Sequence, residues 1–386
     1  MKTVRLYYQD AYIRNFSASV LSCEAENDRY AVVLDRTAFF PEGGGQAADT
    51  GTLDDAAVLD VRERGDVIIH YTDRPLSVGV TASCAVDWPL RFRRMQEHTG
   101  EHIISGLVHT YFGFENVGFH LGDESCTVDF DGELSREALD QVEDLANRAV
   151  WDNRAVTTIF PSPEELPSIQ YRSKLDLTAD VRLVVIDGID ICACCAPHVS
   201  RTGEIGVIKI LDHMRHRGGT RLWLKCGADA LADYRSRYAA SAALSQLLNV
   251  PQAEIVPAAE RFFARQDALK YRVTELERRE LERQAAAIVP TEGDILLFAD
   301  ADDAGMRILA NAGMEKCGGV CAVFSGESGD YRFVMGSRAW DMRGFVKDNR
   351  ENLALRGGGQ ERMVSGRCGA SKEQLNAFFT GKEKSS

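Results

Sequence analysis

The stretch CCAPHVSRTGEIG, residues 194–206, places a cysteine and a histidine four positions apart between two strand-like runs. The run VRLVVIDGIDICACC predicts a strand that leads into this loop, and GEIGVIKILDHMR predicts the next strand. Cys194 and His198 are therefore either buried residues with a purely structural role or two ligands of a metal ion. If they are ligands, two further donors must come from elsewhere in the chain.

A second pair of donors lies in QEHTGEHII, residues 96–104, which the pattern predicts to be helical. His98 and His102 are four residues apart, so on a helix they share one face, with Cβ atoms roughly 5–6 Å apart. Imidazole nitrogens and a cysteine thiolate are the donors that zinc takes in tetrahedral sites. His98, His102, Cys194 and His198 are thus candidates for a single zinc site that joins a helix to a loop.

A purely structural role for these residues is the alternative to a zinc site. A histidine pair at this spacing is common on helices and is more often structural or exposed than metal-bound. A cysteine and a histidine four apart are an equally weak signal, and Cys192 and Cys195 compete with Cys194 as the donor. Thr99 follows His98 where a zinc protease would have its catalytic glutamate, which disfavours a peptide hydrolase.

Length and composition bound the class of protein. The 386 residues predict two to four domains, and a hydrophobic content of 45% is ample for packed cores. No apolar run approaches the roughly 18–20 residues of a membrane span, and MKTVRLYYQDAY lacks the apolar segment of a signal peptide. We therefore expect a cytoplasmic protein without a membrane partner. Its ten cysteines fit reduced thiols and a metal site better than a disulfide scaffold.

The net charge of −13 argues against a nucleic-acid partner, but basic residues cluster locally. RFRR, which contains Arg91, Arg93 and Arg94, directly precedes the first histidine pair. The segment 209–225 carries five basic residues and one acid. Such patches can contact phosphates on an acidic protein, although solvated surface charge is the alternative explanation.

The chain is predicted to be an α+β multidomain protein with four parts. Short strand-like runs in residues 1–90 predict a small, glycine-rich β-barrel, and alternating helices and strands in 91–227 predict a two-layer α/β domain. Residues 228–288 are charged and helical, as in a linker or coiled coil. Strands and helices return in 289–386, which predicts a C-terminal α/β domain.

Two glycine clusters separate strand-like runs. In RTAFFPEGGGQAADTGTL, three consecutive glycines precede Gln46, and such residues allow backbone angles that other residues disfavour. A substrate could therefore approach the main chain at Gly44 and Gly45, although a flexible loop is the alternative. The second cluster, RGGGQERMVSGRCG, spans residues 356–369.

Four motifs stand in one order along the chain: FPEGGGQAADTG, HTGEH, CCAPHVSRTGEIG and GGGQERMVSGRCG. This order resembles the editing half of alanyl-tRNA synthetase, and most closely the long form of the free-standing alanyl-tRNA editing proteins known as AlaX. The resemblance is strong over residues 1–225. Residues 228–386 resemble the helical linker and C-terminal domain of the synthetase and of the long AlaX forms.

The resemblance implies roles for residues of the first half. The zinc ligands of the family fall on His98, His102, Cys194 and His198. Cys195 lies where the family commonly has glycine, and Cys194 is preferred as the ligand because it keeps the three-residue gap to His198.

The glycine-rich motif of the family implies further site residues. Gln46 closes this motif and is expected to act in the substrate pocket as a catalytic residue. Thr37 matches a position that can hydrogen-bond a serine hydroxyl, and Gly44 and Gly45 are expected to line the same pocket.

The second half is expected to contact tRNA. Arg356, Arg362 and Arg367 lie in the glycine cluster that resembles the tRNA-binding part of the synthetase. The charged helices before this cluster could pair two copies of the chain into a homodimer.

The implied activity is a zinc-dependent aminoacyl-tRNA deacylase, which hydrolyses serine or glycine from mischarged alanine tRNA. The Zn²⁺ could activate water or position the substrate. No general base stands out, because Glu101 is expected to point away from the helix face that both histidines share. The alternatives are a non-catalytic, zinc-containing tRNA-binding protein and a phosphoesterase related through its C-terminal domain, although the chain has no Asp-His-His motif.

Overall fold

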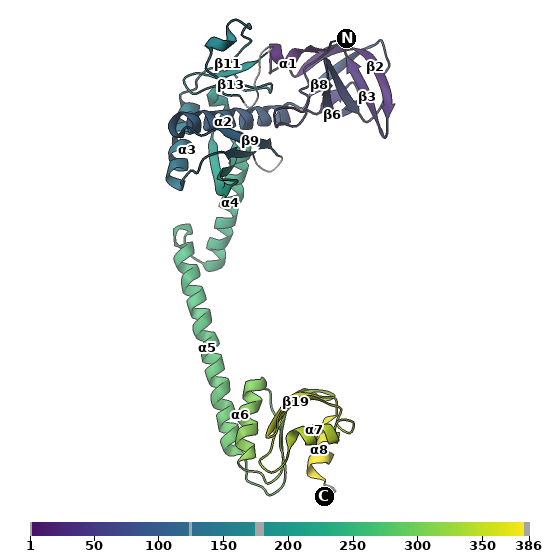
Figure 1. Ribbon diagram of the computed structural model, residues 1–386, viewed down its shortest axis with the longest axis vertical. Helices are drawn as coiled ribbons and strands as arrows, with labels where there is room; N and C mark the ends of the chain where they lie inside the picture. The colour runs from purple at the N-terminus through teal and green to yellow at the C-terminus, as the bar shows by residue number, and fades with distance from the viewer. Residues whose placement is uncertain (1, 123–125, 174–180, 382–386) are drawn as a thin grey trace. The chain divides into compact units, whose positions relative to one another are not determined.

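The computed structural model describes residues 2–122, 126–173 and 181–381 as a mixed α+β chain with several sheets and, within these ranges, eight α-helices (Figure 1). The predicted α+β class is confirmed. The chain divides into two compact units, Met1–Ala243 and Leu244–Ser386. The four predicted domain boundaries stay predictions. Within the described ranges, no helix combines the length and apolar character that a membrane span requires.

The first unit begins with a closed barrel of six strands. In their order around the barrel these are β2 (Asn15–Glu26), β3 (Arg29–Leu34), β7 (Val67–Thr72), β6 (Ala56–Arg64), β5 (Gly51–Leu53) and β8 (Thr81–Val86). The alternation along β8 shows why the strands form, since Ala82, Cys84 and Val86 are buried and point to one face. Outside the barrel, β1 (Val4–Arg5) pairs with β4 (Arg36–Thr37), and α1 (Leu6–Gln9) follows β1.

The long helix α2 (Trp88–Phe112) follows the barrel and carries the first histidine pair. Its start is fixed by Asp87, whose carboxylate accepts a hydrogen bond from the Leu90 backbone N–H, with Pro89 in the first turn. Its end is fixed by Gly113 in the left-handed conformation. Most residues from Met95 to Val108 are buried, because the helix lies between layers of the fold.

Helices and two sheets surround α2. The predicted helix start at Ser135 is confirmed, since its hydroxyl accepts a hydrogen bond from the Ala138 N–H at the start of α3 (Arg136–Trp151). One sheet has the order β14 (Ile208–His216), β15 (Gly219–Cys226), β10 (Cys126–Phe130), β9 (Asn116–Leu121). The other has the order β11 (Val156–Ile159), β12 (Leu183–Ile186), β13 (Asp190–Ala193). The core of this part includes Ile104, Val128 and Leu224 from α2 and the four-stranded sheet.

Two strand predictions around the quoted stretch need correction. The run from residue 181 to 195 is a hairpin of β12 and β13 rather than one strand, because Gly188 takes a φ of +67° and turns the chain. The run that begins at Gly203 starts as the 3₁₀ turn η2 (Thr202–Ile205), and β14 begins only at Ile208.

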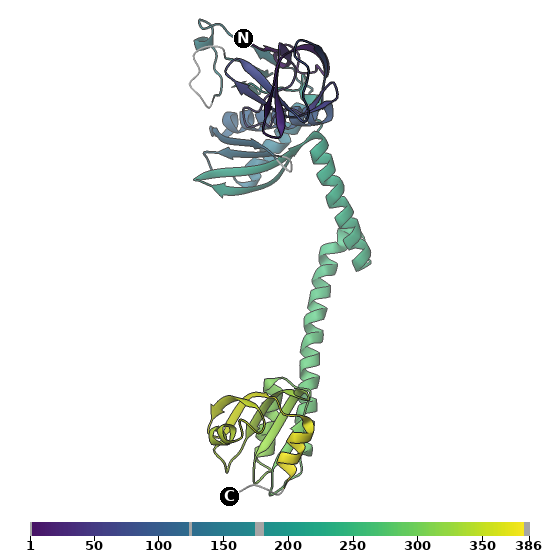
Figure 2. The ribbon, with the colours of Figure 1, turned by 90° about the vertical axis from the view of Figure 1, so that its right-hand side faces the viewer.

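The second unit continues from α4 (Gly227–Leu248), which crosses the boundary between the units. Pro251 separates α4 from α5 (Ile255–Ala287), as predicted, with the short η3 (Gln252–Glu254) between them. The sheet has the order β16 (Ile295–Phe298), β17 (Cys321–Glu327), β18 (Asp330–Gly336), β20 (Met363–Cys368), β19 (Leu355–Gln360). Helices α6 (Asp303–Met314), α7 (Met342–Asp348) and α8 (Lys372–Thr380) pack on this sheet (Figure 2, green to yellow). One short turn remains in the first unit, η1 (Leu166–Ser168).

Candidate metal centre

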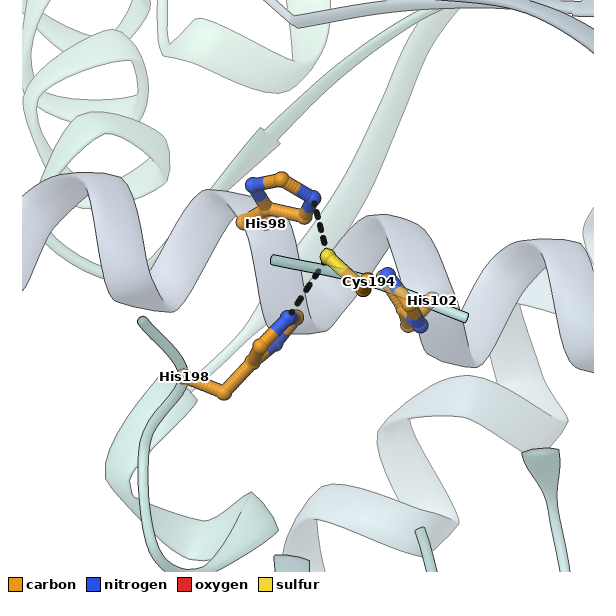
Figure 3. Close-up of side chains that lie close together, drawn as sticks. All are labelled: His98, His102, Cys194 and His198. Atoms are coloured by element: carbon orange, nitrogen blue, oxygen red, sulfur yellow. Dashed lines mark hydrogen bonds between the residues drawn. The ribbon is translucent and has the colours of Figure 1, made fainter. Parts of the chain in front are cut away.

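Four side chains from two distant segments meet in the first unit. His98 and His102 lie one turn apart on α2, and the loop after β13 brings Cys194 and His198 against them (Figure 3). One donor atom from each residue lies within 4.8 Å of the other three. The Cys194 Sγ is 3.5 Å from the His98 Nε2 and 3.4 Å from the His198 Nε2. This arrangement could hold a metal ion.

The two histidines of α2 are oriented by acceptors behind them. The Nδ1–H of His98 donates to the Oε1 of Gln46 at 2.8 Å, and the Nδ1–H of His102 donates to the Asp190 carboxylate at 3.1 Å. Arg172 in turn holds Asp190 with two hydrogen bonds of 2.8 and 2.9 Å. Because the Nδ1 of both rings faces an acceptor, Nε2 is the nitrogen of each ring that is left to bind a metal.

His198 is oriented in the same way by Thr99. The Thr99 hydroxyl donates to the Met95 carbonyl at 2.7 Å, so it can only accept from the Nδ1–H of His198 at 3.0 Å. Thr99 also accepts from the Val199 N–H, which ties the loop to α2. The Nδ1 of each of the three histidines is therefore engaged by an acceptor, which leaves Nε2 as the ring atom for a metal, as in metal-bound histidines.

The thiol of Cys194 is suited to deprotonation. Burial raises its pKa, but the nearby imidazoles of His98 and His198 and the hydrogen bonds that the thiol shares with His102 and His198 outweigh this effect, and the pKa lies well below its usual value. Arg182 fixes the loop, since its Nη1 donates to the carbonyls of Cys194 and Ala196 at 2.8 and 2.9 Å.

The competing cysteines have different surroundings. Cys195 packs with Tyr7, Phe40 and Ala196, and burial raises the pKa of its thiol to about 11. Cys192 lies with His102 and Asp190 in a second group of three candidate donors, which shares His102 with the first. Of the three cysteines, Cys194 is therefore the one that three imidazoles surround.

A cavity of about 580 Å³ adjoins these residues. Its lining includes His98, His102 and Cys194 together with Gly44 and Gly45 from the glycine-rich loop. The structure thus brings five of the predicted site residues to one cavity. The rest of the lining combines charged side chains with apolar ones, so the cavity suits a ligand that has both polar and apolar groups.

The glycines of this loop allow its backbone to pack closely against β9 of the same chain. Gly45 has a φ of +80°, and a Cβ there would lie 2.6 Å from the ring of Phe119 on β9. The Leu121 N–H donates to the Gly45 carbonyl at 3.0 Å, and Gln46 forms a bridge to Leu121. Gln46 is 1% exposed and its Nε2 has no hydrogen-bond partner in the described chain. The loop is thereby fixed to β9, with Gln46 behind His98.

Thr37, on β4, is buried against His70 of the barrel strand β7 and is not part of the lining of this cavity. Burial lowers the pKa of His70 to about 4, so its ring is neutral, and its Nδ1–H donates to the Val32 carbonyl. The Thr37 hydroxyl therefore donates to the Nε2 of His70 at 2.8 Å and accepts from the Phe39 N–H. Its predicted contact with a substrate hydroxyl stays a prediction.

Arg91 was predicted to contact tRNA, and its burial shows that this prediction is wrong. The side chain is completely buried, forms an ion pair with Asp49, and donates to the carbonyls of Ala11 and Ala38. Asp49 belongs to the glycine-rich motif and also accepts from the Phe40 N–H at 2.6 Å. Arg91 thus joins α2 to the barrel and the glycine-rich loop.

The other predicted tRNA contacts lie in different places. Arg93 pairs with Asp229, and Arg94 donates to the Ala48 carbonyl at 2.6 Å. Arg356, Arg362 and Arg367 are exposed in the second unit, where the glycine cluster forms the antiparallel pair β19 and β20. Arg356 and Arg367 lie directly opposite each other in that pair.

Glu101 was expected to point away from the histidines, and the structure corrects this expectation. The residue is 3% exposed and lines the same cavity as His98 and His102. A helix turns about 100° per residue, so a side chain three positions after His98 lies only about 60° from it. The roles of Asp190 and Thr99 were not predicted from the sequence. The only sequence signals for these roles were the position of Asp190 two residues before Cys192 and that of Thr99 directly after His98.

Comparison with known proteins finds two matching families. Residues 181–222, which contain Cys194 and His198, match the threonyl and alanyl tRNA synthetase second additional domain. Residues 7–90 match the class II (A) tRNA synthetases. The first match covers the loop of the candidate metal centre, and the second covers the barrel and its glycine-rich motif.

Similar proteins include both ligases and editing proteins. Alanine–tRNA ligase of Ignicoccus hospitalis is 35% identical over 230 residues, 56% of this chain and 25% of the ligase. Alanyl-tRNA editing protein Aarsd1 of Rattus norvegicus is 34% identical over 223 residues, 53% of this chain and 54% of that protein. Alanine–tRNA ligase of Halobacterium salinarum is 32% identical over 360 residues, 87% of this chain and 38% of the ligase.

The chain therefore spans between a quarter and about half of the length of these relatives. The match to the Halobacterium ligase extends over most of the chain, so it includes sequence from the second unit. The motifs, the two family matches and these relatives agree, and the chain is a relative of the alanyl-tRNA editing proteins and of the corresponding part of alanine–tRNA ligases.

Proposed function

We propose that this protein is a zinc-dependent deacylase that removes serine or glycine from mischarged alanine tRNA. The observation that carries the proposal is the convergence of three imidazole rings on the Cys194 thiol at the edge of a cavity. Three nitrogens and one thiolate form a donor set that zinc accepts. The relatives named as alanyl-tRNA editing proteins supply the substrate class.

The need for such an activity follows from recognition energetics. A pocket built for alanine cannot strongly exclude glycine, since one methyl group changes binding by only about 1–3 kcal/mol. An apolar pocket also rejects the added hydroxyl of serine weakly. A second site that hydrolyses these products is therefore required. The cavity here differs from a purely apolar pocket in that charged side chains, among them Glu101 and Arg172, are part of its lining.

Zinc bound here would supply a Lewis acid that can polarise or orient the substrate ester. The four residues would complete a tetrahedral set, which favours positioning of the substrate. Gln46, predicted to be catalytic, acts in this proposal as a positioning residue, because it holds the His98 ring. Asp190 and Thr99 hold the other two rings in the same way.

The proposal is tested by the release of serine from serine-charged alanine tRNA, with and without a chelator. We expect release by the zinc-loaded protein and its loss after chelation, with correctly charged alanine tRNA left intact. Binding of the tRNA without release would instead establish a non-catalytic zinc-containing tRNA-binding protein. Hydrolysis of a phosphate ester in place of the aminoacyl ester would establish the phosphoesterase.

We also propose a tRNA contact in the second unit. A cavity of about 400 Å³ lies between α7 and the edge strand β19. Its lining contains four cations and, in the part of the chain that the structure describes, no acidic residue. These cations are Arg343, Lys347, Arg350 and Arg356, and none forms an ion pair with a described residue. On a chain with a net charge of −13, such a local excess favours a phosphate ligand.

Neutralising two of these cations should weaken tRNA binding. We expect Lys347→Gln with Arg350→Gln to raise the Kd for tRNA and to lower the slope of log K against log salt by about two, one for each lost phosphate contact. Arg338→Gln is the matched control, because Arg338 is exposed in the same unit but pairs with Glu315. Fluorescence titrations at several salt concentrations measure both quantities. An unchanged slope in the double variant would exclude this cavity as the contact.

A homodimer through the second half remains part of the proposal. Phe262, Leu269 and Leu276 recur every seven residues along α5 and are each more than half exposed. An apolar stripe at this spacing favours a helical partner. Sedimentation of the full chain measures the oligomeric state.

A further inference from the structure

The cavity beside the metal centre contains a buried carboxylate that forms no ion pair with a described cation. Glu101 lies on α2 between His98 and His102 and is 3% exposed. No ion pair joins it to any arginine, lysine or histidine in the described ranges. Burying a charge without a partner costs free energy, so such groups are usually paired.

Neutral donors fix the orientation of this carboxylate. Its Oε1 accepts a hydrogen bond from the Ser105 hydroxyl and another from the Asn116 Nδ2, at 2.6 Å for the latter. Asn116 also lines the cavity and bonds the Ser105 hydroxyl at 3.2 Å. The Oε2 accepts no hydrogen bond from a described residue. This oxygen nevertheless remains accessible to solvent. One carboxylate oxygen is therefore held by the protein, and the other remains available at the cavity.

Two other charged residues of the lining, Arg172 and Glu115, already form ion pairs with other residues. Arg172 gives both of its hydrogen bonds at this site to Asp190, although it lies close enough to feel the charge of Glu101. Glu115 is half exposed and pairs with His109. Glu101 thus differs from the second acidic residue of the lining in being buried and lacking a cationic partner.

We propose that Glu101 binds the α-ammonium group of the aminoacyl ester and thereby restricts the site to esters with a free α-amino group. This inference rests on the proposed deacylase function. An ammonium group donates charge-assisted hydrogen bonds and offsets the cost of the buried carboxylate. An N-acylated ester, such as a peptidyl ester, carries no charge there and leaves Glu101 unpaired, so the site would select aminoacyl over peptidyl tRNA.

The test compares serine-charged alanine tRNA with its N-acetylated form, using the full chain loaded with zinc. We expect the native protein to hydrolyse the free-amine substrate with the higher kcat/KM. Glu101→Gln keeps the shape and the hydrogen bonds to Oε1 but removes the charge. It should lower kcat/KM for the free-amine ester by about tenfold to a hundredfold, the loss expected for a charged hydrogen bond. The N-acetyl ester should be affected little.

Glu115→Gln is the control, and it should keep the native preference between the two substrates. Zinc content and circular dichroism establish that the Glu101→Gln variant folds and keeps its metal. Binding of a non-hydrolysable amide analogue of seryl-adenosine and of its desamino form gives a readout besides activity. The native protein should favour the amino form, and Glu101→Gln should bind both equally.

The outcomes separate this inference from the function on which it rests. A native protein that releases no serine overturns the deacylase function. A native protein that is active, together with a Glu101→Gln variant that keeps the full preference for the free amine, overturns the role of Glu101 alone. A variant without zinc would show that Glu101 supports the metal centre structurally, which also overturns the proposal.

Discussion

Replacing Cys194 by alanine is expected to remove the zinc and abolish deacylation, whereas replacing Cys195 by alanine should preserve both. Cys194 lies 3.4–3.5 Å from two imidazole nitrogens, and the histidines hold its pKa well below the usual value. Cys195 packs in an apolar cluster, and its pKa is raised to about 11. A metal ligand must be deprotonated, so of these two cysteines Cys194 has the surroundings of a ligand.

Metal analysis of the purified variants checks this expectation. We expect about one zinc per chain in the native protein and in Cys195→Ala, and a large loss of zinc in Cys194→Ala. Rates of serine release from serine-charged tRNA should follow the metal content. The opposite pattern would move the thiolate ligand to Cys195 and weaken the alignment with the editing proteins.

Removing the charge of Asp49 should destabilise the first unit by about 3–5 kcal/mol, because it leaves a fully buried arginine unpaired. Arg91 is completely buried, and Asp49 is its described carboxylate partner. For a unit of this size each 1 kcal/mol shifts the Tm by about 2–4 °C, so Asp49→Asn should lower the Tm by about 10 °C. Calorimetry of the full chain resolves this transition.

A surface pair provides the matched control. Glu133 pairs with Arg215 while both side chains are largely exposed, and such pairs contribute about 0–1 kcal/mol. Glu133→Gln should therefore leave the Tm nearly unchanged. Equal shifts in the two variants would show that the buried pair does not anchor α2 to the barrel.

Local signals predicted several elements correctly. The cap at Ser135 and the break at Pro251 depend on residues within a few positions, so they can be inferred without knowledge of the fold. The spacing of His98 and His102 likewise places both on one face of a helix whatever surrounds it. The division of residues 181–195 into two strands was missed, because the apolar runs hid the turn at Gly188.

The tertiary structure decided what each polar residue does. Arg91, Arg93 and Arg94 are equally basic in the sequence, yet Arg91 is buried against Asp49, which lies 42 positions earlier. Glu101 lines the cavity because β9 and the loop after β13 enclose that face of α2.

The sequence by itself determined the donor types, their spacing and the motif order that relates this chain to the editing proteins. Only the tertiary structure decided that Gln46, Asp190 and Thr99 orient the three imidazoles. The physical reason is that hydrogen bonds across 52, 88 and 99 positions depend on how distant segments pack, which local periodicity does not encode.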